Sequence, residues 1–191
     1  MKPKPAINTL TGAVSNQYKI ENTTPADLEF IYGLFDKAIE YQLKNKFPVW
    51  KENDKSILIK DIDNKSQYKI VIENHIAIVF SVFYKDPLIW GEKENGDAVY
   101  LHRIVVNPSF KGKKLFAAIL HWTLGHAKEK GCRFVRMDTW ADNPAIIDYY
   151  KGFGFRFMGN CTTPDSLELP PQYRKLALTL LEMDVLPGVP I

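Results

Sequence analysis

The most constraining stretch of this sequence is residues 97–131, which combine a strand pattern, a short basic turn and a helix pattern. Residues 98–106 are rich in β-branched and aromatic side chains and end at Asn107-Pro108, which is typical of a strand. Residues 114–130 carry apolar side chains at helical spacing, and Gly131 is a natural stop. A helix N-terminus after a basic turn offers free N–H groups and a favourable dipole to an anion. The stretch therefore predicts a site for a ligand that carries a pyrophosphate.

This strand, turn and helix resemble motif A of the GNAT superfamily of acyl-CoA-dependent N-acyltransferases. The matching positions are Val106, Pro108, Gly112 and Leu115. The short signature of the family is Gln/Arg-x-x-Gly-x-Gly/Ala, and here Lys111, Lys114 and Phe116 stand at its three fixed places. Glycine lets a backbone approach a phosphate without a Cβ in the way, so these departures bear directly on how a phosphate would fit.

A second segment, residues 133–157, resembles motif B of the same family. The matching positions are Asn143, Ile146, Ile147, Tyr150, Gly154 and Phe155. Two motifs in the right order are much more specific than either one alone. The resemblance covers roughly residues 97–157, and the element order of the family can be laid on residues 18–185.

Local patterns place the remaining elements along the chain. They predict strands at residues 18–21, 68–73, 76–84, 134–139, 155–160 and 175–185, and helices at residues 24–44, 54–62 and 145–151. Asn74-His75 is expected to form a tight hairpin, and residues 85–96 are expected to form a loop.

The resulting order, β-α-α-β-β-β-α-β-α-β-β, is the one that the GNAT fold implies. We therefore expect an α/β (α+β) fold, with one GNAT-like domain at residues 18–191 after an N-terminal extension, residues 1–17. Its central mixed, mostly antiparallel sheet should have six to seven strands and about four flanking helices.

Composition narrows the classes of function. A chain of 191 residues with 46% hydrophobic and 25% charged residues is typical of one globular domain. The net charge of +3 is too small to argue for a nucleic-acid partner, and no apolar run approaches the ~20 residues that span a bilayer. Two cysteines give no disulfide framework, and four scattered histidines give no metal site. We expect a cytoplasmic enzyme that has neither a metal nor a membrane partner.

The resemblance implies acetyl-CoA as the cosubstrate and a primary amine of a small molecule as the acceptor, which attacks directly in a ternary complex. The strand edge should pair with the pantetheine arm, N–H groups near Ile104 should polarise the thioester, and the basic turn should hold the pyrophosphate. The residues expected to bind the cofactor are Ile104, Val105, Val106, Lys111, Gly112, Lys113, Lys114, Leu115, Phe116, Ala117, Asn143 and Tyr150. A homodimer is a possible assembly.

Two residues are candidates for catalysis. Tyr150 stands at the general-acid place of the family, although a tyrosine at such spacing is also a common packing residue. Asn143 either bonds the cofactor arm or caps a helix. Relatives carry a glutamate near Tyr100, but residues 98–106 contain no carboxylate, so His102 is the candidate base. A water molecule in place of His102, or a purely structural His102, are the alternatives.

Strict alternation along the central strand predicts which residues share a face with His102. That face should carry Tyr100, His102, Ile104 and Val106, and the other face should carry Leu101, Arg103 and Val105.

Three other functions compete with acetyl transfer to a small amine. The chain could transfer a longer acyl group, or it could be a non-catalytic CoA-binding sensor or partner-binding module. A nucleic-acid binder that uses residues 111–114 is disfavoured by the low net charge.

Overall fold

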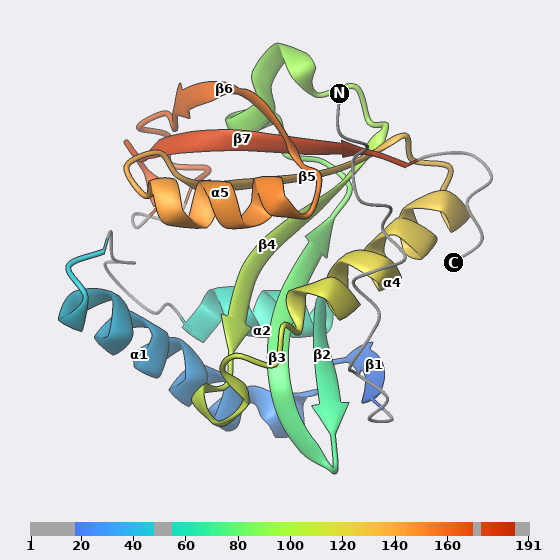
Figure 1. Cartoon of the computed structure of the whole chain (residues 1–191), viewed down its shortest axis with the longest axis vertical. Helices are drawn as coiled ribbons and strands as arrows, with labels where there is room; N and C mark the ends of the chain where they lie inside the picture. Colours follow the sequence, from blue (N-terminus) through green and yellow to red (C-terminus); the bar gives the residue numbers. More distant parts are fainter. Residues whose placement is uncertain (1–17, 48–54, 170–172, 186–191) are drawn as a thin grey trace, which may run out of the picture.

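A seven-stranded sheet forms the centre of the protein, in the order β1-β2-β3-β4-β5-β7-β6 (Figure 1). The computed structural model describes residues 18–47, 55–169 and 173–185, so the predicted N-terminal extension lies outside the described residues. The strands are β1 Tyr18–Asn22, β2 Gln67–Ile72, β3 His75–Phe83, β4 Ala98–Val106, β5 Phe134–Trp140, β6 Arg156–Thr162 and β7 Ala177–Asp184. All neighbouring pairs are antiparallel except β4 and β5. The mixed, mostly antiparallel sheet that the sequence predicted is confirmed.

Helices cover both faces of this sheet. They are α1 Leu28–Lys44, α2 Lys55–Asp63, α3 Pro87–Trp90, α4 Phe116–Glu129 and α5 Pro144–Gly152, with short 3-10 turns at Pro25–Asp27, Gly91–Lys93 and Pro108–Phe110. α4 and α5 lie over one face, whereas α1 and α2 lie over the other (Figure 1). The predicted order of strands and helices is confirmed, with α3 as an addition.

Two local predictions were wrong in detail. The β2–β3 hairpin turns at Glu73-Asn74, one residue earlier than expected, because both residues adopt positive φ (49° and 63°) and Ile72 pairs with His75. The expected loop at residues 85–96 contains α3, and Trp90 at its end is 2% exposed against Tyr100. A short helix that begins at Pro87 places the apolar Trp90 indole in the core.

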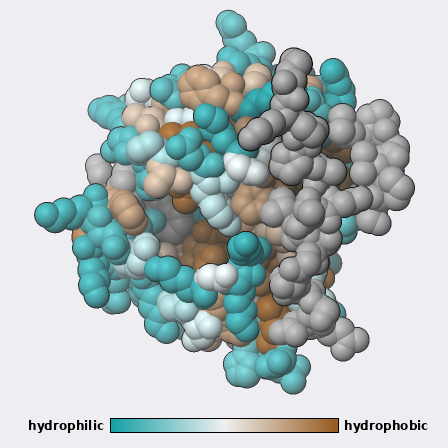
Figure 2. Space-filling model, in the orientation of Figure 1, coloured by the Kyte–Doolittle hydropathy of each residue, from teal (hydrophilic) through white to brown (hydrophobic). Residues whose placement is uncertain are grey.

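Two main clusters of buried side chains hold the layers together. The larger one lies under α4 and α5 and joins residues of five strands, among them Phe80, Leu101 and Val135. The smaller one joins α1 and α2 to Val79 and Val105. Hydrophobic residues also gather near the middle of the face that α4 and α5 cover, with hydrophilic residues around them (Figure 2).

A β-bulge in β4 changes which side chains share a face. Val105 pairs with Val79 and His102 pairs with Ser81, so two residues of β4, Arg103 and Ile104, stand opposite one residue of β3. Arg103 has a φ of 49°, as the first residue of such a bulge often does. The extra residue shifts the alternation by one position.

The predicted division of faces was therefore wrong beyond the bulge. Ile104 packs into the cluster under α4, whereas Val105 joins the cluster under α1 and α2. Arg103 also reaches the α2 side, where it binds Asp61. Tyr100 and His102, which precede the bulge, share a face as expected, since they pair with Phe83 and Ser81.

The pairing of β4 with β5 ends abruptly. The two strands pair from Ala98 with Phe134 to Leu101 with Met137. Beyond that point β4 stays with β3 and β5 stays with β7, so the sheet divides into two halves. Within the described residues, the edge of β4 that faces this gap has no strand partner from residue 102 to residue 106.

Phe116 ties α4 to α5. Its ring is 4% exposed and lies 4.9 Å from the rings of both Tyr150 and Phe153, centroid to centroid, with Phe155 slightly farther away. This residue, which stands at a glycine or alanine place of the family signature, is therefore part of the core.

We predict that Phe116→Ala lowers the free energy of unfolding by about 3–5 kcal/mol, because it removes a buried aromatic side chain and leaves a cavity. Phe157→Ala is the matched control, since Phe157 on β6 is 55% exposed, and it should change stability by about 0.5 kcal/mol or less. Urea unfolding of both variants measures the difference. Equal losses would contradict the packing role of Phe116.

Candidate active site

The basic turn between β4 and α4 keeps the backbone shape of a glycine-rich loop. Gly112 and Lys114 have φ angles of 85° and 52°, the left-handed region that glycine adopts at little cost. Asn107 fixes the start of the turn, because its side-chain amide donates to the Ile76 carbonyl (2.8 Å) and its oxygen accepts from the Ser109 amide (3.1 Å). Lys114 thus adopts a conformation that a glycine would hold with less strain.

Four amides of the turn are available to a ligand. Among the described residues, the N–H groups of Gly112, Lys114, Leu115 and Phe116 have no backbone partner. The Lys113 amide donates to the Phe110 carbonyl (3.3 Å) and the Ala117 amide donates to the Lys114 carbonyl (3.1 Å). The predicted run of free amides from Gly112 to Ala117 is therefore narrower than expected.

The side chains of the turn point in different directions. The Phe116 ring is buried on the core side of α4. Lys111 Nζ lies 4.2 Å from the centroid of the Tyr41 ring on α1, and Lys113 Nζ lies 5.1 Å from that of Phe110. The lysines add positive charge beside a helix N-terminus, which suits an anion.

A buried cluster of ionisable groups lies where β4 and β5 separate. His102 and Asp138 are the first residues after the last β4–β5 pair, and Asp86 follows β3. His102 Nε2 lies 3.3 Å from Asp86 Oδ2, and His102 Nδ1 lies 3.5 Å from Asp138 Oδ1. The three side chains are 14–16% exposed.

Neither contact is aligned as a hydrogen bond. Asp86 Oδ2 and Asp138 Oδ1 are buried, and among the described residues neither has a hydrogen-bond partner. Buried carboxylate oxygens normally have such a partner, and here each of the two lies at ion-pair distance from a ring nitrogen of His102.

The cluster shifts the pKa of its members. Burial alone would lower the pKa of His102, but the carboxylates of Asp86 and Asp138 outweigh it and raise that pKa above its ordinary value of 6.5. Burial raises the pKa of Asp138, and the charge of Asp86 adds to the increase while His102 opposes it. Shifted pKa values of this kind are common where an enzyme transfers protons.

A second charged pair supports this cluster. Arg103 Nε donates to Asp61 Oδ2 (3.0 Å), Arg103 Nη2 binds the same oxygen, and the Ser81 hydroxyl donates to it as well (2.9 Å). Tyr173 lies beside Arg103 and contributes to the raised pKa of the guanidinium. Arg103 is thus fully engaged beside His102.

Tyr100, at the place where relatives carry a glutamate, is a core residue. Arg136 Nη1 donates to its hydroxyl (2.9 Å), and the side chain is buried. Burial, with Glu94 beside it, raises its pKa. His102 therefore remains the candidate base on this strand.

The motif B residues lie on α5, on the other side of the gap. Tyr150 is 8% exposed, and burial raises its pKa, with smaller contributions from Tyr149 and Asp138. Its phenol therefore stays protonated at neutral pH, as a proton donor must. Asn143 caps α5, because its side-chain oxygen accepts from the Ile146 amide (3.2 Å). Among the residues that the structure describes, the side-chain NH₂ group of Asn143 has no hydrogen-bond partner.

The sequence reading missed Asp86, Asp61 and Tyr173. Asp86 stands before Pro87, a pattern that predicts only a turn or a helix start. The contact of Asp138 with His102 has no local signal in the sequence either. No pattern in the sequence links these positions, since they are brought together by strand pairing.

Asp86, His102 and Asp138 also have the geometry of a cation site. One ligand atom from each of Asp86, His102 and Asp138 lies within 4.8 Å of the others, which suits a metal ion as well as an ammonium group.

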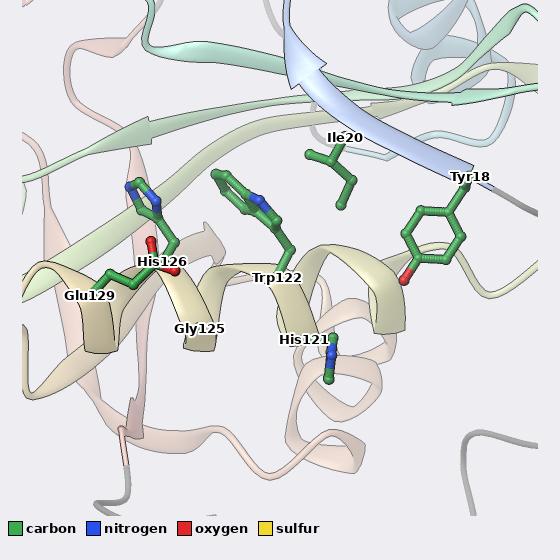
Figure 3. Close-up of a pocket in the computed structure, with 7 residues that line it drawn as sticks. All are labelled: Tyr18, Ile20, His121, Trp122, Gly125, His126 and Glu129. Atoms are coloured by element: carbon green, nitrogen blue, oxygen red, sulfur yellow. The ribbon is translucent and has the colours of Figure 1, made fainter. Parts of the chain in front are cut away.

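A separate pocket of about 370 Å³ lies between β1 and α4 (Figure 3). Tyr18 and Ile20 face the helix, and the Trp122 and His126 rings stack at 4.8 Å and 12°. His126 Nε2 also bonds the Tyr84 hydroxyl (2.7 Å). The residues that line it are Tyr18, Ile20, His121, Trp122, Gly125, His126 and Glu129. None of them is a predicted site residue, and β1 lies at the far edge of the sheet from the gap.

Comparisons with known proteins agree with this architecture. The sequence profile of the Acetyltransferase (GNAT) family matches residues 34–155. The chain is 28% identical over 166 residues to the uncharacterized N-acetyltransferase YesJ of Bacillus subtilis, covering 74% of this chain and 89% of YesJ.

Solved structures share the fold. A GNAT-family acetyltransferase from Listeria monocytogenes superposes with a TM-score of 0.70 at 18% identity, over 90% of this chain and 97% of that one. The structure of yncA from Salmonella typhimurium with its cofactor acetyl-CoA superposes with a TM-score of 0.62 at 15% identity. The match covers 92% of this chain and 98% of that one. In the described part of this chain, no helix has the length and hydrophobicity needed to cross a membrane.

We predict that Lys114→Gly raises the free energy of unfolding by about 0.5–1 kcal/mol, because it relieves a left-handed non-glycine residue. Lys113→Gly is the control: Lys113 has no positive φ, so the added freedom of the unfolded chain should destabilise it. Denaturant unfolding of both variants measures the two changes in the free energy of unfolding. If Lys114→Gly is the less stable of the two, the turn is not strained.

We predict that the His102 ring titrates above pH 6.5, whereas His126, whose pKa is lowered by burial and then by Lys130, titrates below it. The stability that the charged His102 contributes is fully present below about pH 6.5 and is lost as the pH rises through its raised pKa. NMR titration of the histidine rings measures both values in one sample. Asp86→Asn should lower the pKa of His102 and leave that of His126 unchanged; an unshifted His102 would refute the coupling.

Proposed function

Since the chain belongs to the GNAT family of acetyltransferases and is an acyl-CoA-dependent N-acyltransferase, we propose that it transfers the acetyl group of acetyl-CoA to a primary amine of a small molecule. The acceptor attacks the thioester directly in a ternary complex. The observation that carries this proposal is the early end of the β4–β5 pairing, because the unpaired stretch of β4 runs from the cluster around His102 to the basic turn before α4.

The cofactor side of the gap is the face of α4 and α5. The pyrophosphate binds the amides of Gly112, Lys114, Leu115 and Phe116, with Lys111 and Lys113 nearby as positive charges. The pantetheine arm pairs with the free edge of β4 at residues 104–106. Because β4 already uses its other edge for β3, this edge can accept a further extended chain.

Acyl transfer needs a donor for the oxyanion that develops on the thioester. The bulge at Arg103 and Ile104 turns backbone groups of β4 away from the regular ladder. The N–H groups near Ile104 are placed to polarise the carbonyl. The bulge therefore serves the chemistry as well as the curvature of the strand.

The acceptor side of the gap is the face of α1 and α2. His102 accepts the proton of the attacking amine in its neutral form, and Asp86 and Asp138 stabilise the imidazolium that results. Tyr150, across the gap on α5, donates a proton to the leaving thiolate of CoA. Asn143 either contacts the pantetheine arm through its NH₂ group or acts only as the helix cap.

The cluster favours turnover over a non-catalytic role in CoA binding. Burying three ionisable side chains together costs stability, and apolar side chains would fill the same space at no such cost. Such an arrangement is expected where it carries out proton transfer.

Thermal melting with acetyl-CoA, with free CoA and with a salt control tests the cofactor site. Ligand at about 100 times its dissociation constant should stabilise the protein by ~2.7 kcal/mol. Gly112→Asp should abolish the shift, because it adds a carboxylate to the anion site at a residue with a φ of 85°. The absence of a shift with either CoA species would refute the proposed site.

Release of CoA thiol in the presence of amines tests turnover. Tyr150→Phe should lower kcat by about 100-fold, the usual contribution of a general acid, while the melting shift with CoA is kept. Tyr149→Phe is the matched control, because Tyr149 is 45% exposed on the same helix. Equal rates for the wild type and Tyr150→Phe would remove Tyr150 from the chemistry.

A further inference from the structure

The acceptor side of the gap carries an excess of negative charge. Three carboxylates, those of Asp61, Asp86 and Asp138, face two cations, Arg103 and the protonated form of His102. When His102 gives up its proton to act as a base, the excess grows by one. The buried position of these groups strengthens their effect on any charge nearby.

The nearby guanidinium cannot offset this excess. Asp61 is 5% exposed and its Oδ2 atom takes two nitrogens of Arg103 as well as the Ser81 hydroxyl. Turning Arg103 towards a ligand would leave a buried carboxylate without its cation, which is strongly unfavourable. Tyr173, which lies beside it, has a pKa raised mainly by burial, so its phenol stays neutral and adds no charge.

The two carboxylates that flank His102 point to the preferred ligand. Asp86 Oδ2 and Asp138 Oδ1 lie on the two nitrogen sides of one imidazole and have no hydrogen-bond partner among the described residues. An ammonium group supplies donors to both oxygens and neutralises the excess charge. A carboxylate close to that ammonium would lie near the same two oxygens and would be repelled by their negative charge.

This last point separates two kinds of amine. In an α-amino acid the carboxylate is attached to the carbon that bears the nitrogen, so no rotation can move it away from the cluster. Like charges about 5 Å apart at an effective dielectric constant of about 20 oppose binding by more than a factor of ten.

We infer that the acceptor is an amine with no carboxylate next to its nitrogen, such as a decarboxylated amino acid, and that Asp86 and Asp138 select it. This inference rests on the proposed acetyl transfer and adds its substrate class. Asp86 and Asp138 then act as specificity residues in addition to supporting His102.

The test uses sets of amines that differ at one substituent. Agmatine, argininamide and arginine each carry one amine, and they differ in having a hydrogen, a neutral amide or a carboxylate beside it. Tyramine, tyrosinamide and tyrosine form a second set. The amides control for size, because they fill the space of the carboxylate without its charge.

The measurement is kcat/KM for CoA release with each amine, taken as ratios within one enzyme preparation. We expect the amine and the amide to exceed the amino acid by about tenfold or more in at least one set. Asp86→Asn and Asp138→Asn should bring the ratio of amide to acid towards one. Asp148→Asn, an exposed carboxylate on α5, removes the same charge elsewhere and should keep the ratio of the wild type.

The outcomes separate this inference from the proposed function. Turnover of arginine or tyrosine as fast as of its amide overturns the inference and leaves acetyl transfer in place. The inference is also overturned if the ratio of kcat/KM for the amide to that for the amino acid is the same in Asp86→Asn and Asp138→Asn as in Asp148→Asn. A melting shift with acetyl-CoA but no thiol release with any amine overturns the proposed transfer itself, and the inference with it.

Discussion

The short parallel pairing of β4 and β5 is the constraint on which the rest of this protein depends. The strands pair from Ala98 and Phe134 to Leu101 and Met137, and then each follows its antiparallel neighbour. The bulge in β4 increases the local twist just beyond the last pair. The sheet is thus held together by the first four residue pairs of β4 and β5, and the unpaired edge of β4 begins directly beyond them.

Two groups of charged side chains lie beside this end of the pairing. Arg103 and Asp61 form a pair that Ser81 completes, whereas His102 lies between Asp86 and Asp138, whose nearest oxygens have no hydrogen-bond partner among the described residues. The first arrangement satisfies every partner, and the second keeps capacity for a ligand. Buried polar groups of the second kind weaken a fold, so their presence indicates a site.

Backbone strain also occurs in this region. Arg103 and Lys114 both adopt left-handed conformations that side chains disfavour, and both lie at the edges of the gap. The surroundings hold them there: Asp61 fixes the arginine side chain, and Phe116 anchors the first turn of α4 in an aromatic cluster. Strain that persists in this way is common at functional sites.

The sequence alone determined the order of strands and helices, the basic turn before α4 and the position of Tyr150 on α5, because periodicity and capping are local properties. Strand boundaries such as Ala98–Val106 followed from the same patterns. Only the tertiary structure decided that the bulge moves Ile104 to the opposite face from His102, and that Asp86 meets His102 and Asp138. Those contacts depend on the hydrogen-bond register between strands distant in the chain, and no local pattern records that register.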